Sequence, residues 1–425
     1  MVGSLSMPNP ANEQELKNLF ALSPQLDWQR LQWQQLSQTG VPGARDQDWL
    51  HTPISAIFTN PTRPSLAQPM DDLSYESLSL HTDAYRLVFF DGKLQETLSD
   101  SIPAVTITSM AALSAEQSEQ LRRSVNADPL CWLIDGMATT GVYVEIAAEQ
   151  ALDKPLYLFH LNSGNQGEVC SYRHHVHLKA QANATIIEHH VSLDLGGGTS
   201  LARLTLAVDD RAECEHIKLV EEGENQQHFA HNDINVAANA QATSHVLMLA
   251  GRMTRHQTSS ALLGSEADIA MNSLALPTDD QVVETRTYLQ HQASHCESNQ
   301  QHKLIGQGRS KSTFDGMILV SPDAIQTNGQ MDNHNLLLSD EARVFCRPKL
   351  EIYADDVKCS HGATTGELNP EQLFYMQARG INETQARQML IQAFARDVLD
   401  AVSLKAVRDH AWQRVSARLT PVSQD

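Results

Sequence analysis

The sequence predicts a mainly β protein whose body is a β-solenoid, with helical regions at both ends. Between Cys131 and Gly362 the apolar residues alternate in short runs and show almost no helical periodicity. The same stretch repeats a tight turn followed by a small residue, whereas the flanking stretches carry apolar residues at helical spacing. We therefore expect a mostly helical N-terminal region (1–130), a solenoid core (131–365) and a C-terminal helical domain (366–425).

The N-terminal region contains two segments with helical spacing of leucine and aromatic residues, 16–22 and 26–36. Gly40 follows the second segment at the position where glycine commonly ends a helix. Residues 85–98 contain an Asp-Gly pair between apolar runs, which predicts a β-hairpin. Ser114 with a glutamine three residues later predicts the capped start of another short helix.

The solenoid prediction rests on strands and on the turns between them. Short alternating runs occur at 142–146, 156–161, 175–178, 186–191, 204–208, 217–220, 234–237 and 245–249. Small residues follow tight turns at 184, 212, 242, 267, 312, 324, 342 and 357. The early gaps are 28, 30 and 25 residues, and the later ones are 12, 18 and 15. This irregular repetition favours a β-solenoid, and a sandwich or barrel with similar strand spacing is the alternative.

The C-terminal stretch is expected to form helices. Asn369 followed by Pro370 is typical of a capped helix start, and Gly380 ends this helix. Asn382 with a glutamine three residues later opens a second helix, and residues 404–419 form a third. The apolar residues of the second helix fall on one stripe: Ala386, Met389, Leu390, Ala393, Phe394 and Val398.

Composition and charge limit the classes of partner and compartment. The 425 residues carry a formal net charge of −20, which makes nucleic acid and anionic membranes poor partners. No apolar run approaches the roughly 18 residues of a membrane span, and we expect no secretory signal at the N-terminus. The six cysteines lie far apart without a Cys-x-x-Cys motif, which favours reduced thiols and a cytoplasmic location.

No catalytic motif is recognisable in the chain. The glycines and lysine of residues 306–312 do not have the spacing of a phosphate-binding loop, and a Gly-x-Ser-x-Gly motif is absent. We therefore expect a protein that does not hydrolyse ATP and is not an enzyme.

Several histidines fall in two neighbouring predicted strands. His174, His175 and His177 form one group, and Glu188, His189 and His190 form the other. If the two strands were adjacent, these side chains could gather at a metal site. Histidines more often lie on a half-solvated sheet face, which is the structure we expect for them.

The stretch with the most specific chemistry contains Cys359 and His361. Both residues alternate with polar neighbours in a predicted strand, so their side chains share a face about 6–7 Å apart. A thiolate and an imidazole suit iron, zinc or copper(I), but two ligands cannot fill a coordination sphere. A metal at this place needs further ligands from elsewhere in the fold or from another chain, and a buried core pair is the alternative.

This stretch also resembles a known family. Residues 355–364, DDVKCSHGAT, and 372–381, QLFYMQARGI, resemble the C-terminal part of the SufB/SufD family of SUF iron–sulfur cluster assembly. The resemblance is dense over 336–401. Where the SufB branch has a glutamate-containing EHEAT, this chain has Cys-Ser-His-Gly-Ala-Thr, which indicates the SufD branch.

The resemblance implies a right-handed parallel β-helix that acts as a non-catalytic scaffold. It implies pairing with SufB through the β-helix body and binding of the ATPase SufC through the C-terminal helices. His361 is then expected to face a SufB cysteine and to hold the nascent cluster, and Cys359 lies at the same interface. The residues expected to contact SufC are Leu373, Phe374, Met389, Leu390 and Phe394.

The cluster, or iron, is expected to be transient at the subunit interface, and no cofactor should stay tightly bound to the isolated chain. The resemblance also associates reduced flavin with the complex, although no dinucleotide-binding motif is recognisable in this chain. The isolated chain is expected to be able to form a homodimer.

Two other interpretations remain open from the residues. One is a stand-alone β-helix metalloenzyme that uses Cys359 and His361, with His334 as an optional third ligand. The other is a purely structural partner without a ligand role, in which replacement of His361 leaves cluster assembly intact.

Overall fold

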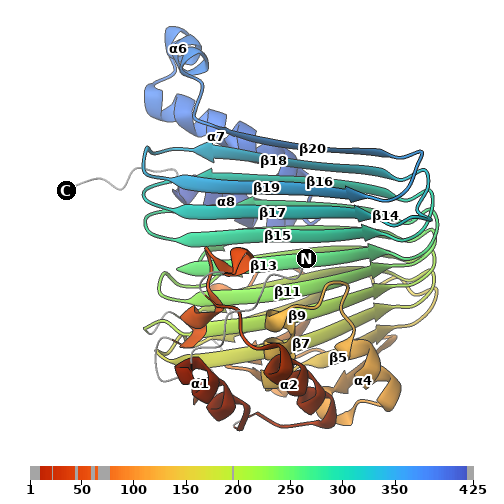
Figure 1. The fold of residues 1–425 in the computed structure, drawn as a ribbon. Coiled ribbons are helices and arrows are strands. Elements are labelled where there is room, and N and C mark those ends of the chain that lie inside the picture. The colour runs from red at the N-terminus through yellow and green to blue at the C-terminus, as the bar shows by residue number, and fades with distance from the viewer. Residues whose placement is uncertain are drawn as a thin grey trace.

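The structure is a computed structural model that describes residues 10–21, 23–43, 46–58, 63–65, 77–193 and 196–418. Its body is a β-solenoid of about eight turns, and helices lie at both ends of the chain (Figure 1). The fold class expected from the sequence is confirmed. Among the described residues, no helix has both the length and the apolar character that crossing a membrane requires.

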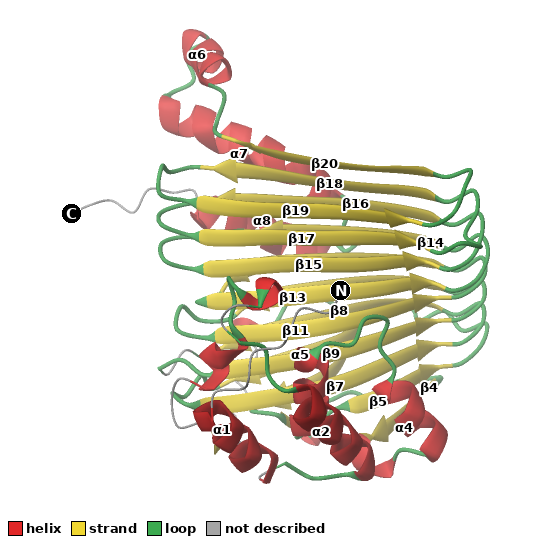
Figure 2. Ribbon diagram, in the orientation of Figure 1, coloured by secondary structure: helices red, strands yellow, loops and turns green. Residues whose placement is uncertain are grey.

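The strands form two ten-stranded sheets that face each other across the interior (Figure 2). In pairing order, the first sheet contains β19 (Arg343–Ile352), β17 (Lys311–Val320), β15 (Val282–His291), β13 (Met253–Leu262), β11 (Gln227–Val236), β9 (Thr199–Val208), β7 (Glu168–Leu178), β5 (Val142–Ile146) and β4 (Val105–Ser109), with β1 (Arg63–Pro64) beside β7. The second contains β20 (Lys358–Gly366), β18 (Asn328–Leu337), β16 (Glu297–Gly306), β14 (Asp268–Ala275), β12 (Gln241–Ala250), β10 (Glu213–Glu221), β8 (Asn183–Ser192), β6 (Leu156–Asn162), β2 (Tyr85–Phe90) and β3 (Lys93–Leu94). Pairing is parallel except in β2–β3 and β4–β5.

The register between coils is regular. Residues that pair across the second sheet are Asn183, Glu213, Gln241, Asp268, Glu297, Asn328 and Lys358, which lie 27 to 31 residues apart. Each coil therefore contributes one strand to each sheet and places equivalent side chains above one another. This stacking is what lets each coil bury small and branched side chains against its neighbours.

The turns explain the irregular gaps in the sequence. On one side of the solenoid, turns place a residue in the left-handed region before a buried small residue. Arg211 (φ 58°) precedes Ala212 in this way, and Glu266 (φ 59°) precedes Ala267. The predicted positions 312 and 342 instead follow turns on the opposite side of the coils, just before β17 and β19. Because every coil has two turns, a series that mixes both sides contains spacings of about half a coil.

The main core lies between the two sheets. Inward-facing residues such as Ile186, Leu206 and Ile269 are fully buried there, and each buried aliphatic side chain contributes roughly 1.5–3 kcal/mol. Polar side chains also point inward, among them His190 and His228. The interior is therefore apolar at one end of the strands and hydrogen-bonded at the other.

The N-terminal helices are α1 (Pro10–Ala21), α2 (Asp27–Thr39), α4 (Ala115–Arg122) and α5 (Pro129–Met137). Short 3₁₀ helices are η1 (Gln47–Trp49), η2 (Ile54–Phe58), η3 (Glu96–Leu98) and η4 (Met110–Ala112). The predicted end of α2 at Gly40 (φ 83°), the β2–β3 hairpin and the Ser114 cap of α4 are confirmed. The nine-residue helix α5 was not predicted, because so short an apolar run has no clear period.

The expected N-terminal region also supplies strands. β2, β3 and β4 all come from residues before 131, and they join the two large sheets. The sheets thus begin earlier in the chain than the predicted solenoid core, and the division into three domains stays a prediction.

The C-terminal helices are α6 (Pro370–Ala378), α7 (Glu383–Asp400) and α8 (Lys405–Arg418). The predicted caps are confirmed, since Asn369 accepts hydrogen bonds at the start of α6 and Asn382 does so at the start of α7. α7 and α8 pack on the outer face of the second sheet through a second apolar core, whereas α6 projects beyond the solenoid (Figure 1). Lys303 of β16 fastens α7, because its Nζ donates to the Phe394 carbonyl (2.7 Å) and to Asp397 (2.6 Å).

Candidate functional site

The candidate site lies at the open end of the solenoid, which the last strand of each sheet forms. Within the described residues, β19 pairs only with β17 and β20 pairs only with β18. No residue of β20 is fully buried, in contrast to the strands inside the stack. The open end therefore presents unpaired backbone groups along two long strands.

Cys359 and His361 both lie on β20 and point to the same side of it, because they are two residues apart in a regular strand. Their partners on β18 are Gly329 and Met331. Met331 is fully buried in the interior core, so the Cys359–His361 face is the one that points inward. His361 is nevertheless exposed, since no further coil covers it.

The Cys359 thiol is half-buried against the core. Its Sγ lies 3.5 Å from the position that a Cβ on Gly329 would occupy, which is an ordinary contact distance, so the sulfur packs beside the paired strand β18. Burial raises the pKa of the Cys359 thiol above its ordinary value. In the isolated chain this sulfur is therefore mainly protonated at neutral pH, and a positive ligand would be needed to hold it as the thiolate.

His334 does not join this pair. It lies on β18, where Met331, Asn333 and Asn335 are buried and alternate with it, so His334 points to the outer face. Its Nδ1 lies 2.8 Å from the hydroxyl of Thr364 on β20. His334 therefore cannot be the optional third ligand of the stand-alone enzyme interpretation, because His334 and His361 face opposite sides of the sheet.

A second cysteine, Cys346 of β19, also points inward at the open end. Its Sγ lies 3.2 Å from Asn333 Oδ1 and 3.2 Å from Asn335 Nδ2, both on β18 of the other sheet. Burial raises the pKa of the Cys346 thiol. Cys346 does not join Cys359, because it lies beside Asn333 and Asn335 of β18, whereas Cys359 pairs with Gly329 nearer the start of that strand.

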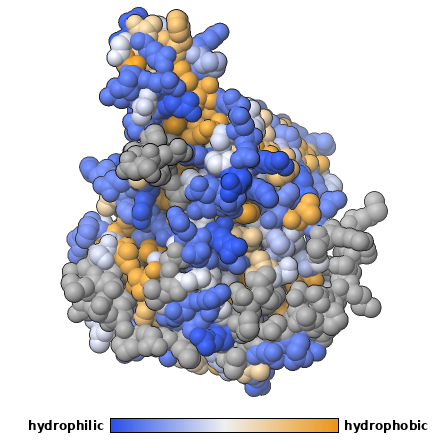
Figure 3. All heavy atoms as spheres, turned by 90° about the vertical axis from the view of Figure 1, so that its left-hand side faces the viewer, coloured by the Kyte–Doolittle hydropathy of each residue, from blue (hydrophilic) through white to orange (hydrophobic). Residues whose placement is uncertain are grey.

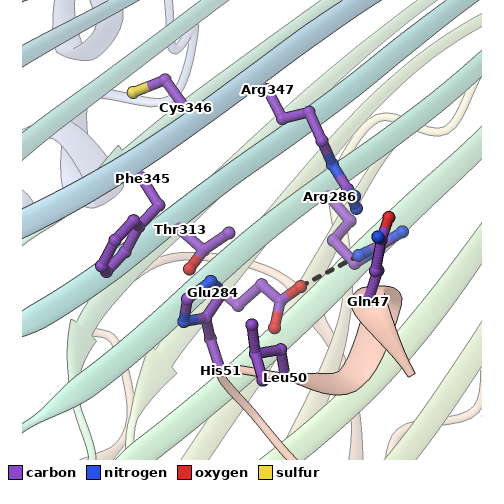
Figure 4. A pocket seen from close by; sticks show the side chains of 9 residues that line it. All are labelled: Gln47, Leu50, His51, Glu284, Arg286, Thr313, Phe345, Cys346 and Arg347. Carbon is purple, nitrogen blue, oxygen red and sulfur yellow. Dashed lines mark hydrogen bonds and ion pairs between the residues drawn. The ribbon is translucent and has the colours of Figure 1, made fainter. Parts of the chain in front are cut away.

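A pocket of about 350 Å³ lies outside the solenoid near the same end (Figure 4). Its wall on the sheet side comes from β15, β17 and β19, and the other wall is the segment around η1. The His51 ring stacks on Phe345 with 4.5 Å between centroids, and Cys346 points away from the pocket (Figure 4).

The charges beside this pocket are paired with one another. Asp315 contacts Arg286, Arg347 and Lys349, and Asp48 contacts the two arginines. Burial opposes ionisation of Asp315, but the three cations outweigh it and hold the pKa of this carboxyl below its ordinary value. These ion pairs fasten the N-terminal segment to the solenoid, and they occupy Arg286, Arg347 and Lys349.

The residues expected to contact a partner on the C-terminal helices have unequal exposure. Phe374 is 72% exposed and Met389 is 50% exposed, whereas Leu373 and Leu390 are half-buried. Phe394 packs on the solenoid, with the Lys303 ammonium 5.1 Å from its ring centroid. Figure 3 shows hydrophobic side chains on the projection at this end of the molecule.

The stripe predicted on α7 therefore divides between two faces. The face toward the sheet carries Ala386, Ile391, Ala395, Val398 and Leu399. Met389 lies away from that face and is exposed.

The histidine groups are not on a half-solvated face, and that expectation is wrong. His174, His175, His177, Glu188, His189 and His190 are all buried. β7 and β8 belong to opposite sheets, so the two groups are not on adjacent strands. His174 and His190 instead meet across the interior through His160, which contacts His174 (2.9 Å) and stacks on His190 (4.2 Å between centroids).

Comparison with known proteins identifies relatives over almost the whole chain. Residues 159–394 match the family described as SUF system FeS cluster assembly, SufBD core domain. The chain is 39% identical over 423 residues to the iron-sulfur cluster assembly protein SufD of Escherichia coli, covering 97% of this chain and 98% of that protein. It is 27% identical over 401 residues to an iron-sulfur cluster assembly SufBD family protein of Synechocystis, covering 90% and 88% respectively.

Proposed function

This chain belongs to the SufBD family of the SUF iron–sulfur cluster assembly system, and from this premise we propose that it is a SufD-type scaffold subunit of the cytoplasm. In this proposal the chain is not itself an enzyme. It pairs with SufB, binds the ATPase SufC and lends ligands to a cluster that is cargo rather than a resident cofactor. The observation that carries the proposal is the inward-facing pair Cys359 and His361 at the open end of the solenoid.

Pairing with SufB is supported by the contrast between the two ends of the solenoid. At the N-terminal end the sheets finish in short antiparallel strands, β3 and β4, which give little edge to a partner. At the other end β19 has ten residues and β20 has nine, and within the described part of the chain each has one edge without a paired strand. Soluble proteins usually protect long edges, so these two strands are suited to a partner that continues the coil.

A partner coil on β20 would bury Cys359 and His361 as Met331 is buried one coil below. The two residues would then supply sulfur and nitrogen ligands to iron, and the partner would supply the rest. When SufB is absent, we propose that the same edges pair two copies of this chain.

Binding of SufC is supported by the projecting helix α6 and the first turns of α7. Phe374, Tyr375 and Met389 are large apolar or aromatic side chains that stay exposed there. Aromatic and methionine side chains are enriched in the centres of protein interfaces. We propose that this projection is the docking surface for the ATPase.

The test is co-purification of the tagged chain with untagged SufB and SufC homologues. We expect both partners to be recovered with the wild-type chain. Phe374→Asp and Met389→Asp together should reduce SufC recovery at least about tenfold, because an unpaired charge would be buried in the interface. Thermal stability should stay within a few degrees of the wild type, since both residues are exposed.

Phe394→Asp serves as the matched control on the same helices. Its side chain packs on the solenoid, so this change should lower thermal stability. Undiminished recovery of SufC with the double variant would remove the projection as the docking surface. Failure to recover SufB with the wild-type chain would contradict the scaffold proposal.

A further inference from the structure

Three buried side chains inside the solenoid lie close enough to bind one metal ion. His190 is on β8, Glu222 follows β10 and His228 is near the start of β11. One nitrogen of each histidine and one oxygen of the glutamate all lie within 4.8 Å of one another. All three side chains are completely buried, so the group is part of the interior and not of the molecular surface.

The hydrogen bonds leave nitrogen lone pairs free at this place. His190 Nε2 lies 2.8 Å from Glu188 Oε1, and a buried carboxylate accepts the proton of this nitrogen. His190 Nδ1 then carries the lone pair, and it has no hydrogen-bond partner. His228 Nε2 also has no partner. When Nε2 carries the ring proton, the lone pair of His228 is on Nδ1, which lies 3.2 Å from Glu222 Oε2 and faces that carboxylate. A histidine oriented by a carboxylate on its far nitrogen is the usual form of a metal ligand.

Within the described part of the chain, no ion pair joins Glu222 to a lysine or arginine. Its carboxylate contacts Asn162 Nδ2 (2.9 Å), the Ser200 hydroxyl and His228 Nδ1 (3.2 Å). The neighbouring Glu188 differs, because Lys218 Nζ lies 2.6 Å from it. The charge of Lys218 also acts on Glu222, but the ammonium is bonded to Glu188. A buried carboxylate is unfavourable without a cation in contact with it, so a metal ion would supply Glu222 with the direct partner that Lys218 does not.

We propose that His190, Glu222 and His228 bind a divalent transition-metal ion, iron(II) or zinc(II), in the interior of the solenoid. Two imidazoles and one carboxylate are a donor set found for both ions. Ligand atoms about 2.0–2.2 Å from the ion would lie about 3.4 Å apart. The ligand atoms now lie within 4.8 Å of one another, so side-chain movements of about 1 Å would bring them to this spacing. The proposal is independent of cluster assembly at the open end.

In a second group, ligand atoms of Asp128, Cys131 and His231 also lie within 4.8 Å of one another, with Asp128 partly buried and the other two buried. There His231 lies 3.7 Å from Asp128 and 3.7 Å from Asp233, and Arg203 contacts Asp233. The acidic groups hold the pKa of His231 well above its ordinary value despite burial. A protonated His231 already supplies the positive charge, so the first group is the stronger metal site.

The experiment measures the metal content of the full chain. The chain is produced in cells supplied with iron or zinc and is purified under anaerobic conditions. After desalting, inductively coupled plasma mass spectrometry should detect about one metal ion per wild-type chain. Glu222→Gln and His228→Asn should each lower the affinity at least about tenfold, as loss of a ligand weakens a site at least as much as loss of a supporting group. His302→Gln is the control, because His302 is also buried in the interior and lies outside the group.

A measurement on the wild-type chain alone avoids dependence on folding of the variants. The chain loaded with cobalt(II) should show the visible bands of a nitrogen and oxygen site without thiolate-to-cobalt charge transfer. Thiolate bands would place the ion at a cysteine and overturn the proposal. So would a wild-type chain without bound metal, or variants that retain as much metal as the His302→Gln control.

Discussion

Met331 and His361 occupy the same register position on neighbouring strands, yet one is fully buried and the other is exposed. This difference in burial does not come from the direction of the side chains, because both point toward the interior. It arises because β18 is covered by β20 and β20 is covered by nothing within the described chain. The chemistry of Cys359 and His361 therefore depends on whatever forms the next coil.

The reactivity of Cys359 tests its environment in the isolated chain. Burial raises the pKa of this thiol, and only the thiolate is alkylated, so less of it reacts at a given pH than of a free thiol. In a Cys346→Ser variant, the alkylation rate of Cys359 should keep rising at pH values where glutathione has already reached its maximum. The measurement is the rate of iodoacetamide modification against pH, followed by mass spectrometry.

The four remaining cysteines are buried and should react only on unfolding. If the modification rate of Cys359 reached its maximum at the same pH as that of glutathione, or at a lower pH, the half-buried position would be contradicted.

The common face of Cys359 and His361 followed from their spacing, because a period of two needs only local strand geometry. The contacts of Cys346 did not follow, since its asparagine partners come from the other sheet. The histidine groups were misplaced for the same reason. Residues that are separated by half a coil face one another across the interior, and no local pattern records this.

The ion pairs beside η1 join three neighbouring strands to the N-terminal segment. Asp315 of β17 lies between Arg286 of β15 and Arg347 of β19, and both arginines also contact Asp48. Asp315 is almost completely buried, so the loss of its charge would leave the cations around it less well paired. This group holds the last coils and the N-terminal segment together.

Asp315→Asn should lower the free energy of unfolding by about 1–3 kcal/mol at neutral pH, because hydrogen bonds to charged groups are lost. The pKa of Asp315 is depressed in the folded chain, so its stabilisation is present above the ordinary aspartate pKa and is lost as pH falls through the folded value. The difference between variant and wild type should therefore shrink below about pH 4. Denaturant unfolding at several pH values measures it.

Asp280→Asn is the matched control, because the Asp280–Arg309 pair is largely exposed. Exposed pairs contribute little, so this variant should stay near the wild type. Equal effects of the two substitutions would show that Asp315 does not hold the segment.

Helix caps and hairpin turns were predictable because a few adjacent residues determine them, as with Asn369, Asn382 and Gly40. The solenoid period was only partly predictable. Strands that are buried on both faces do not show the alternation of apolar and polar residues that marks a half-buried strand. Turns on the two sides of a coil also have the same composition. The face of α7 that packs on the sheet also depended on tertiary contacts, such as that of Lys303 with Phe394.

The protein is asymmetric along the solenoid axis. Short antiparallel strands and helices finish the N-terminal end, and the C-terminal end leaves β19 and β20 without neighbours among the described residues. The projecting helix α6 lies at that same end (Figure 1). The proposed surfaces for SufB and SufC are thus close together, which would let a movement of the ATPase reach the site of Cys359 and His361.

We propose above all that His361 lends a ligand to a cluster at the interface with SufB. The most direct test is the content of iron and acid-labile sulfide in the purified complex of this chain with SufB and SufC homologues. His361→Ala should leave the complex intact, since one small side chain contributes little to a large interface, but should remove most of the iron and sulfide. His334→Ala, on the opposite face of the same sheet, should retain both. Wild-type iron and sulfide in the His361→Ala complex would contradict the claim.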